Sequence, residues 1–379
     1  MMTLPPLSLY IHVPWCVRKC PYCDFNSHTQ AGELPEREYL AALMADLDLD
    51  RGAVHGRALQ SIFFGGGTPS LLTPQTIGAI LDGVAARIAF APDIEITLEA
   101  NPGTVEQQRF DGFRSAGINR LSLGVQSLNP LHLQALGRIH DREQAIGAVR
   151  QARRAGFDNI NLDLMHGLPG QNVDAAAADL LAAIALAPEH LSWYQLTIEA
   201  NTEFFKRPPT LPPDDTLAAI QDRGAELLAL HDYRQYEVSA FCRPGRSARH
   251  NRNYWLFGDY FGIGAGAHGK LTGVDGRVER TRKTRLPRDY LASGGRCDRG
   301  AEQVSPEELP FEFMLNALRL TDGFPRQLYA LRTGLPWDSV SGAVARLTAR
   351  GLLHETRDTV APTLLGQRFL NDVLAEFLE

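Results

Sequence analysis

Short runs rich in β-branched residues alternate with longer amphipathic runs along the first two thirds of the chain. Apolar positions that repeat every second residue are typical of strands, and those that repeat every three to four residues are typical of helices. The short runs predict six strands, over Leu7–Val13, Ser61–Phe64, Ile94–Glu99, Arg120–Gly124, Asn159–Leu164 and His190–Leu196. Six strands that alternate with helices predict a parallel α/β sheet, which is either open and doubly wound or curved into a barrel.

Residues with capping chemistry mark where several of the intervening helices begin. Thr73 is a good N-cap followed by Pro74, and Asp141 forms a capping-box pair with Gln144. The predicted helices cover Glu36–Asp50, Thr73 to about Ala89, Thr104 to about Gly117, Asp141 to Gly156, a run from Asp174, and Asp214–His231.

Chemically unusual residues follow the predicted strands and favour the barrel. In chain order they are the three cysteines Cys16, Cys20 and Cys23, the run Gly65–Gly67, then Glu99, Gln126, Asp163, and the pair Gln195 and Thr197. In a barrel the carboxyl ends of all strands converge on one face, whereas in an open sheet only two or three of them meet. We therefore expect a partial (β/α)6 barrel with its site at that face.

The end of the chain has a different pattern. From about Ala301, two apolar helical stripes, a short hairpin over Leu352–Pro362 and a last helix predict a mostly helical, winged-helix-like domain. Its seven arginines against eleven acidic residues argue against a DNA-binding wing. The predicted division is a barrel over 1–245, a connecting segment over 246–300 and the C-terminal domain over 301–379.

Composition narrows the class of protein. The 379 residues are 44% hydrophobic and 22% charged, as in globular proteins, and the net charge of −6 is unlike that of a general nucleic-acid binder. The longest apolar stretch, Leu180–Pro188, is far shorter than the ~20 residues of a membrane helix. No secretory leader pattern is visible, so we expect a cytoplasmic protein without a transmembrane segment.

Three of the five cysteines lie in one loop, with the spacing C-x3-C-x2-C. Cys16, Cys20 and Cys23 could ligate three irons of a cubane cluster and leave the fourth iron open. A zinc site completed by His12 or His28, and a redox dithiol, are alternatives at this point. The remaining two, Cys242 and Cys297, show no ligand spacing and are expected to be structural thiols.

The glycine-rich turn Gly65-Gly66-Gly67-Thr68-Pro69 after the second strand makes the pattern more specific. Together with the cysteine loop, it resembles the radical S-adenosylmethionine (SAM) superfamily, and within it the coproporphyrinogen-dehydrogenase-like group. The resemblance implies a [4Fe–4S] cluster on the three cysteines, whose open iron is chelated by the methionine part of SAM. It also implies a SAM pocket lined by Tyr10, Tyr22, Gly66, Gly67, Thr68, Glu99, Gln126, Arg138 and Asp163. Glu99 suits the ammonium of SAM, Arg138 its carboxylate and Asp163 a ribose hydroxyl.

Departures from the group's pattern indicate which branch the chain resembles. The decarboxylating members carry a fourth cysteine in C-x3-C-x2-C-x-C, and Phe25 stands at that position here. What remains is similar to the HemW-type branch of haem chaperones. That resemblance implies binding of haem and its delivery to haem-accepting proteins, respiratory ones included. The alternative is an oxygen-independent coproporphyrinogen III dehydrogenase that decarboxylates its substrate through a 5′-deoxyadenosyl radical.

A second motif points to haem. The segment His250-Asn251-Arg252-Asn253-Tyr254-Trp255 matches the H-N-x-x-Y-W motif of that branch, so His250 is a candidate axial ligand and Tyr254 a flat wall for a porphyrin. An aromatic-rich strand with a hydrogen-bonded histidine is the structural alternative. Gly262–Gly269 predicts a tight turn, and the basic stretch Arg277–Arg288 predicts either a solvated loop or contacts to haem propionates.

Overall fold

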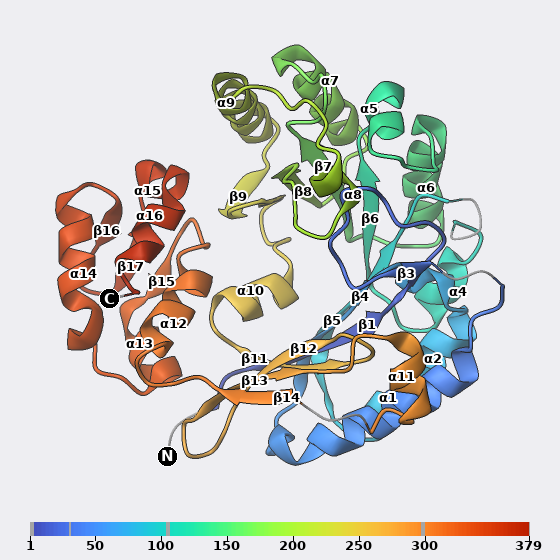
Figure 1. Ribbon diagram of the computed structural model, residues 1–379, viewed down its shortest axis with the longest axis horizontal. Coiled ribbons are helices and arrows are strands. Elements are labelled where there is room, and N and C mark those ends of the chain that lie inside the picture. Colours follow the sequence, from blue (N-terminus) through green and yellow to red (C-terminus); the bar gives the residue numbers. More distant parts are fainter. Residues whose placement is uncertain (1–3, 30–31, 104–106, 297–299, 379) are drawn as a thin grey trace.

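The computed structural model describes residues 4–29, 32–103, 107–296 and 300–378. Six parallel strands form the centre of a 12-stranded sheet, as predicted. In sheet order they are β1 (Leu7–Val13), β4 (Leu59–Gly66), β5 (Phe90–Ala100), β6 (Arg120–Gln126), β7 (Ile160–His166) and β8 (His190–Gln195). The sheet curves around without its outermost strands pairing in the described part of the chain, so the expectation of a partial barrel is confirmed (Figure 1).

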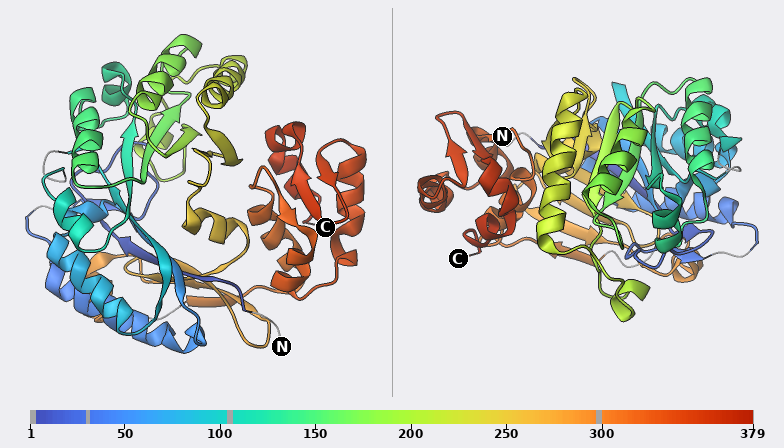
Figure 2. Two further views of the ribbon diagram at one scale, coloured as in Figure 1. Left: turned by 180° about the vertical axis from the view of Figure 1, so that it is seen from behind. Right: turned by 90° about the horizontal axis from the view of Figure 1, so that it is seen from above.

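Helices cover the outer, convex side of the curved sheet (Figure 2). They are α1 (Glu36–Asp50), α2 (Pro74–Ala85), α4 (Phe110–Ser115), α5 (Pro130–Ala135), α6 (Arg142–Arg154), α7 (Val173–Ile184) and α9 (Asp214–Leu230). The short α8 (Glu203–Lys206) lies beside the cysteine loop instead, where the Phe204 amide donates to the Pro21 carbonyl. The caps at Thr73 and at Asp141 with Gln144 form as predicted. Helix α2 ends four residues before Ala89, because the chain must turn back to enter β5. The predicted cap Thr104 lies outside the described residues.

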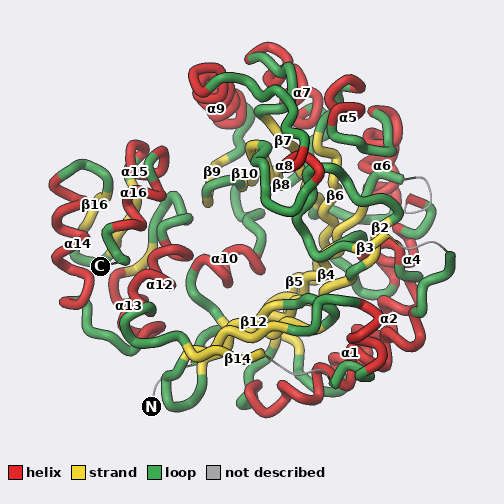
Figure 3. The backbone as a smooth tube through the Cα atoms, in the orientation of Figure 1, coloured by secondary structure: helices red, strands yellow, loops and turns green. Residues whose placement is uncertain are grey.

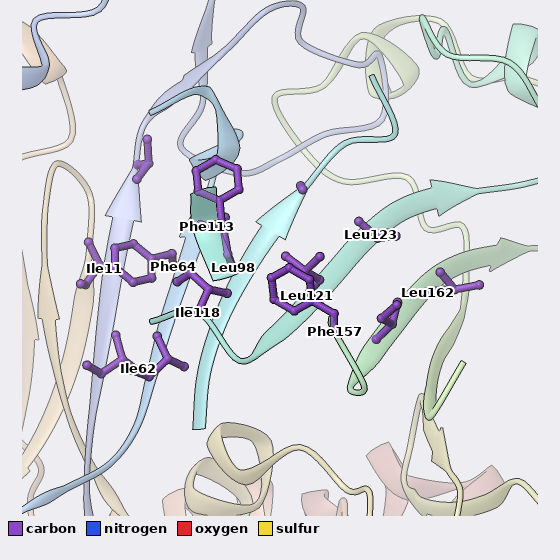
Figure 4. Close-up of a cluster of buried hydrophobic side chains, with 14 of the residues drawn as sticks. Ile11, Ile62, Phe64, Leu98, Phe113, Ile118, Leu121, Leu123, Phe157 and Leu162 are labelled. Carbon is purple, nitrogen blue, oxygen red and sulfur yellow. The ribbon is translucent and has the colours of Figure 1, made fainter. Parts of the chain in front are cut away.

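A continuous apolar core joins the sheet to these helices. Strands β1, β6 and β7 are each buried except for one residue; in β1 that residue is Tyr10. Strands that are covered on one side by helices and on the other by the barrel interior are buried on both faces, so polar and apolar residues do not alternate along them. Figure 4 shows strand residues such as Leu98 and Leu121 in one cluster with Phe113 of α4 and with Ile118 and Phe157 from the loops that follow α4 and α6.

The segment 246–300 extends the sheet instead of only connecting domains. Strand β11 (Asp259–Ile263) pairs parallel to β1, and β12 (His268–Thr272), β13 (Val278–Arg282) and β14 (Gly300–Gln303) follow antiparallel. The predicted turn at Gly262–Gly269 is confirmed as the β11–β12 connection. The basic stretch is not simply a solvated loop: five of its twelve residues form β13, and Lys283 is buried between Asp46 and Asp50 of α1.

The motif that contains His250 forms helix α10 (Arg249–Trp255), so the strand alternative is wrong. The helix lies on the inner side of the barrel, between the sheet and the C-terminal domain (Figure 3). The other edge of the sheet consists of β10 (Ala240–Cys242), antiparallel to β8, and β9 (Arg234–Glu237). The short elements β2 (Trp15–Cys16), β3 (His28–Thr29) and α11 (Pro287–Ala292) complete this part of the chain.

The C-terminal unit has its own core of buried apolar residues. Its helices are α12 (Leu309–Ala317), α13 (Arg326–Thr333), α14 (Asp338–Ala349), α15 (Leu364–Arg368) and α16 (Leu370–Ala375). A small sheet of β15 (Phe324–Pro325), β17 (Thr359–Pro362) and β16 (Leu353–Glu355) packs with them, as a winged-helix-like domain predicts. Among the described residues, no helix is both long and apolar enough to cross a membrane.

Candidate active site and adjoining aromatic cavity

The three clustered cysteines line one cavity of about 270 Å³ at the carboxyl ends of the central strands. Cys16 ends β2 and is buried, whereas Cys20 and Cys23 are half-buried. Burial raises the pKa of the Cys16 and Cys23 thiols. No three metal-ligating side chains of the described residues converge on a single ion. A cubane cluster requires a different arrangement of cysteines, because each thiolate binds a separate iron atom and the three need not converge on one point.

The glycine run lets the cysteine loop lie against β4. The Gly67 amide donates to the Val13 carbonyl and the Thr68 amide to the Trp15 carbonyl, both at 2.8 Å. A Cβ atom on Gly67 would collide with the Trp15 carbonyl oxygen, and Gly66 has a φ of 117°, a conformation that side chains disfavour. The glycines therefore fix the entry to the cysteine loop while their own backbone lines the cavity.

Glu99, near the end of β5, is a buried carboxyl on the cavity wall. Its Oε2 accepts a hydrogen bond from the Gly66 amide at 3.2 Å. Burial, and next the charge of Asp163, raise the pKa of Glu99 to about 8, and the Gly66 hydrogen bond only partly opposes this. Such a carboxyl is stabilised in its ionised form by a cationic ligand.

Gln126 and Asp163 come from the next two strands, Gln126 as the last residue of β6 and Asp163 from the middle of β7. The Asp163 carboxylate accepts hydrogen bonds from Ser122 at 2.9 Å and from Asn161 at 2.8 Å, while burial raises its pKa. Gln126 has a φ of 66°, and its side-chain oxygen accepts from the Tyr194 hydroxyl at 2.8 Å. Both side chains are held in place by neighbours before any ligand binds.

Arg138, in the loop after α5, reaches into the same cavity. Its guanidinium donates to the Asn101 side chain and to the Gly124 carbonyl, both at 2.6 Å, and lies 3.6 Å from the Cys20 sulfur. Its Nε is buried and has no hydrogen-bond partner among the described residues. A buried cation with an unused donor next to a thiol is suited to an anionic ligand group.

The structure brings nearly all predicted cofactor residues together. Around the first cavity lie Cys16, Cys20, Tyr22, Cys23, Gly66, Gly67, Thr68, Glu99, Gln126, Arg138 and Asp163. Neither Gln195 nor Thr197 lines it; Tyr194 from the same strand does, because successive strand residues face opposite sides. Sequence reasoning also missed Asn101, although its position two residues after Glu99 could have indicated the same face.

Tyr10 lines a second cavity instead, of about 940 Å³, which adjoins the first and shares Phe25, Gly66 and Glu99 with it. Its aromatic lining is Tyr10, Phe25, Phe63, Tyr254, Trp255 and Tyr260, and its basic lining is His12, His268, Arg282, Lys283 and Arg285. The Trp255 indole nitrogen is buried without a hydrogen-bond partner. Large, mostly aromatic cavities with a few charged groups are typical of small-molecule sites.

The structure places the two predicted haem residues differently. Tyr254 lines the second cavity, whereas His250 does not. His250 is buried, its Nδ1 lies 2.8 Å from Glu95 Oε1, and its ring packs against Phe63 at a centroid distance of 4.3 Å. Although burial raises the pKa of Glu95, the hydrogen bond and charge of His250 bring it down to about 2. The axial-ligand role of His250 stays a prediction.

Comparison with known proteins agrees with this architecture. The model of the Radical SAM superfamily matches residues 10–183, and that of the HemN C-terminal domain matches residues 304–369. A solved structure of coproporphyrinogen III oxidase (HemN) from Escherichia coli, described as a radical SAM enzyme, is similar with a TM-score of 0.83. The likeness covers 99% of this chain and 90% of that one at 22% identity, which shows the fold alone. Fold and cysteine site thus define a radical SAM protein.

More similar relatives specify the family. Heme chaperone HemW of Escherichia coli K12 is 51% identical over 378 residues, covering 100% of both chains. The protein of the same name from Bacillus subtilis is 34% identical over 98% of this chain and 99% of its own. Radical S-adenosyl methionine domain-containing protein 1 of mouse mitochondria is 37% identical over 91% of this chain and 81% of its own. The chain belongs to the HemW family.

Membership in the radical SAM superfamily implies a [4Fe–4S] cluster and SAM. The first cavity fits them, because three thiols, a glycine-lined backbone, a buried carboxyl and a buried guanidinium with an unused N–H face the same space. When bound, the reduced cluster supplies an electron to SAM. The chain's own residues would hold the ligand, with Glu99 and Arg138 offering the opposite charges that an amino-acid group requires.

Proposed function

We propose that this chain is a chaperone that binds haem and delivers it to acceptor haemoproteins. The radical SAM core holds the cluster and SAM, and haem occupies the second cavity. The observation that carries the proposal is the position of that cavity, which adjoins the cofactor cavity and has aromatic walls with arginines at one side. The names of the relatives at 34–51% identity support the same assignment.

The lining of the second cavity suits a flat, amphipathic tetrapyrrole. Rings such as Tyr254 and Trp255 offer surfaces for stacking against a porphyrin, and Arg282 and Arg285 offer charge to its propionates. The volume of about 940 Å³ falls within the ~300–1,000 Å³ of small-molecule pockets. A propionate bound there would lose its contacts with water and form ion pairs with the two arginines. These ion pairs would fix the orientation of the porphyrin ring.

Residues of the first cavity take separate roles in this proposal. Cys16, Cys20 and Cys23 ligate the cluster, Glu99 pairs with the ammonium of SAM, and Arg138 pairs with its carboxylate. Ser122 and Asn161 orient the Asp163 carboxylate, which accepts a hydrogen bond from a ribose hydroxyl of SAM. Glu99 lines both cavities, so that occupancy of one changes the electrostatics of the other.

Helix α10 connects the H-N-x-x-Y-W motif to the barrel. Glu95 accepts hydrogen bonds from the backbone amides of Arg249 and His250 as well as from the His250 ring. This carboxylate therefore anchors the first turn of α10 and fixes the direction of Tyr254, one turn further along. In this arrangement the motif's histidine positions the aromatic wall of the cavity.

Porphyrinogen decarboxylation is the second candidate function. Phe25 replaces the fourth cysteine of the decarboxylating members and lines both cavities with 59% of its surface exposed. A phenyl ring there can neither donate a proton nor form a thiyl radical. Incubation with coproporphyrinogen III, SAM and a reductant is therefore expected to give no vinyl product, and vinyl groups would favour the decarboxylase.

Titration of ferric haem into the anaerobically reconstituted chain tests the chaperone proposal. We expect Tyr254→Ala and Trp255→Ala each to weaken binding by about 5–30-fold, equivalent to ~1–2 kcal/mol of lost aromatic contact. Phe205→Ala is the matched control, because that ring is exposed on α8 and does not line the second cavity. Unchanged affinity in both cavity variants would place haem elsewhere on the protein.

A further inference from the structure

Three imidazoles lie in or behind the second cavity, and two of them are already engaged. His250 sits behind Phe63 and hydrogen-bonds Glu95. His12 lines the cavity, but its Nδ1 lies 2.8 Å from the Tyr10 hydroxyl and its Nε2 lies 2.9 Å from the Asn26 carbonyl. An iron atom could bind either ring only after these contacts break.

The third imidazole, His268, is different in position and in partners. It is the first residue of β12, it is exposed, and it lines the second cavity. No hydrogen bond to its ring is found in the described part of the chain. Because side chains alternate along a strand, His268 points to the same side of the sheet as Lys270, which contacts Phe257 on the inner side of the barrel.

Cations surround this ring. Arg282 is the cross-strand partner of His268 in the β12–β13 register and lines the same cavity, as does Arg285. Burial, and next the charges of Arg282, Arg285 and Arg280, lower the pKa of His268. The neutral form of imidazole is the one that ligates a metal, so this environment favours ligation over protonation.

We infer that His268 is the axial ligand to the iron of haem in this cavity, while Arg282 and Arg285 bind the propionates. The inference rests on the proposed function and names the residue that would recognise iron within it. Two groups of residues then have different roles in the cavity. The aromatic walls bind any porphyrin, whereas His268 distinguishes the iron-containing porphyrin from the iron-free one.

The experiment compares ferric haem with iron-free protoporphyrin IX on the full-length chain. We expect His268→Ala to weaken ferric haem binding by about tenfold or more, since even indirect support of a metal ligand is worth that much. The electron paramagnetic resonance signal characteristic of histidine-ligated ferric haem should be lost and should return with added imidazole. Binding of protoporphyrin IX should be unchanged, which separates loss of a ligand from loss of structure.

Two further variants make the outcome decisive. His354→Ala removes an exposed histidine from strand β16 and is the matched control, with wild-type behaviour expected. His250→Ala should keep the axial-ligand spectrum. A wild-type spectrum in His268→Ala, or loss of the axial signal in His250→Ala alone, overturns the inference and leaves the proposed function intact. Failure of the wild-type chain to bind either porphyrin overturns the proposed function itself.

Discussion

Replacing Glu99 by glutamine should make the cofactor-free protein more stable at alkaline pH. Glutamine has the same shape and can still accept the hydrogen bond from the Gly66 amide, so the substitution removes mainly the charge. In the folded state the pKa of Glu99 is raised from 4.5 to about 8, chiefly by burial. The folded protein therefore holds a proton between these two pH values that the unfolded chain has lost, and stability falls as pH rises through this window.

The magnitude follows from the same two pKa values. At ~1.36 kcal/mol per pKa unit, the rise from 4.5 to about 8 costs the wild-type protein up to ~5 kcal/mol above pH 8. With an unfolding entropy of ~2.1 cal/mol/K per residue over 379 residues, this corresponds to a difference in Tm of about 6 °C. Near pH 4.5 the difference between Glu99→Gln and the wild type should vanish.

Thermal unfolding of cofactor-free wild type and Glu99→Gln between pH 4.5 and 9 measures this difference. Glu143→Gln, an exposed carboxyl on α6, is the control and should follow the wild type. Parallel pH profiles for wild type and Glu99→Gln would refute the reasoning, because they would mean that Glu99 ionises as an ordinary carboxyl. As a second readout, SAM binding at pH 7 should release more protons in the wild type than in Glu99→Gln, because only the wild-type carboxyl ionises when the ligand binds.

Further predictions concern the cysteine loop and the buried charges. Serine at Cys16, Cys20 or Cys23 should abolish the cluster's iron and sulfide content, whereas Cys242→Ser, a buried cysteine outside the loop, should keep it. Gly67→Ala should lower cluster content after reconstitution, because its Cβ meets the Trp15 carbonyl; Gly78→Ala on α2, whose Cβ would make only an ordinary 3.7 Å contact with the Ala116 Cβ, should not. Lys283→Met should cost ~3–5 kcal/mol in chemical denaturation, because it removes the buried cation that pairs with Asp46 and Asp50. Lys206→Met, which breaks only an exposed pair, should cost less than ~1 kcal/mol, and equal losses would contradict the buried-charge argument.

The central strands and the cofactor cavity could be predicted from the sequence because each strand carries its own signal. A buried parallel strand is a run of apolar residues, and a polar residue at its carboxyl end has one face on which to lie. Glu99, Gln126 and Asp163 follow this rule, and the structure brings them together. At β8 the prediction is wrong by one residue, because it names Gln195 whereas Tyr194 lines the cavity. Only the strand register determines which of these two side chains faces inward.

The extended sheet edge could not be predicted in this way. Strands β12 and β13 contain cations such as Lys270, which would be costly to bury alone. These cations are buried because acidic residues of other elements pair with them: Asp259 of the neighbouring strand β11 with Lys270, and Asp46 of the distant helix α1 with Lys283. The placement of His250 behind Phe63 has the same origin, since its partner Glu95 comes from a strand more than 150 residues earlier.

An iron-edge anomalous difference map from crystals of the reconstituted chain with haem is the most direct measurement. It should contain a cluster peak at Cys16, Cys20 and Cys23 and a separate single-iron peak in the cavity walled by Tyr254 and Trp255. A haem peak outside that cavity, or a cluster peak alone at saturating haem, would contradict the assignment of the second cavity to haem.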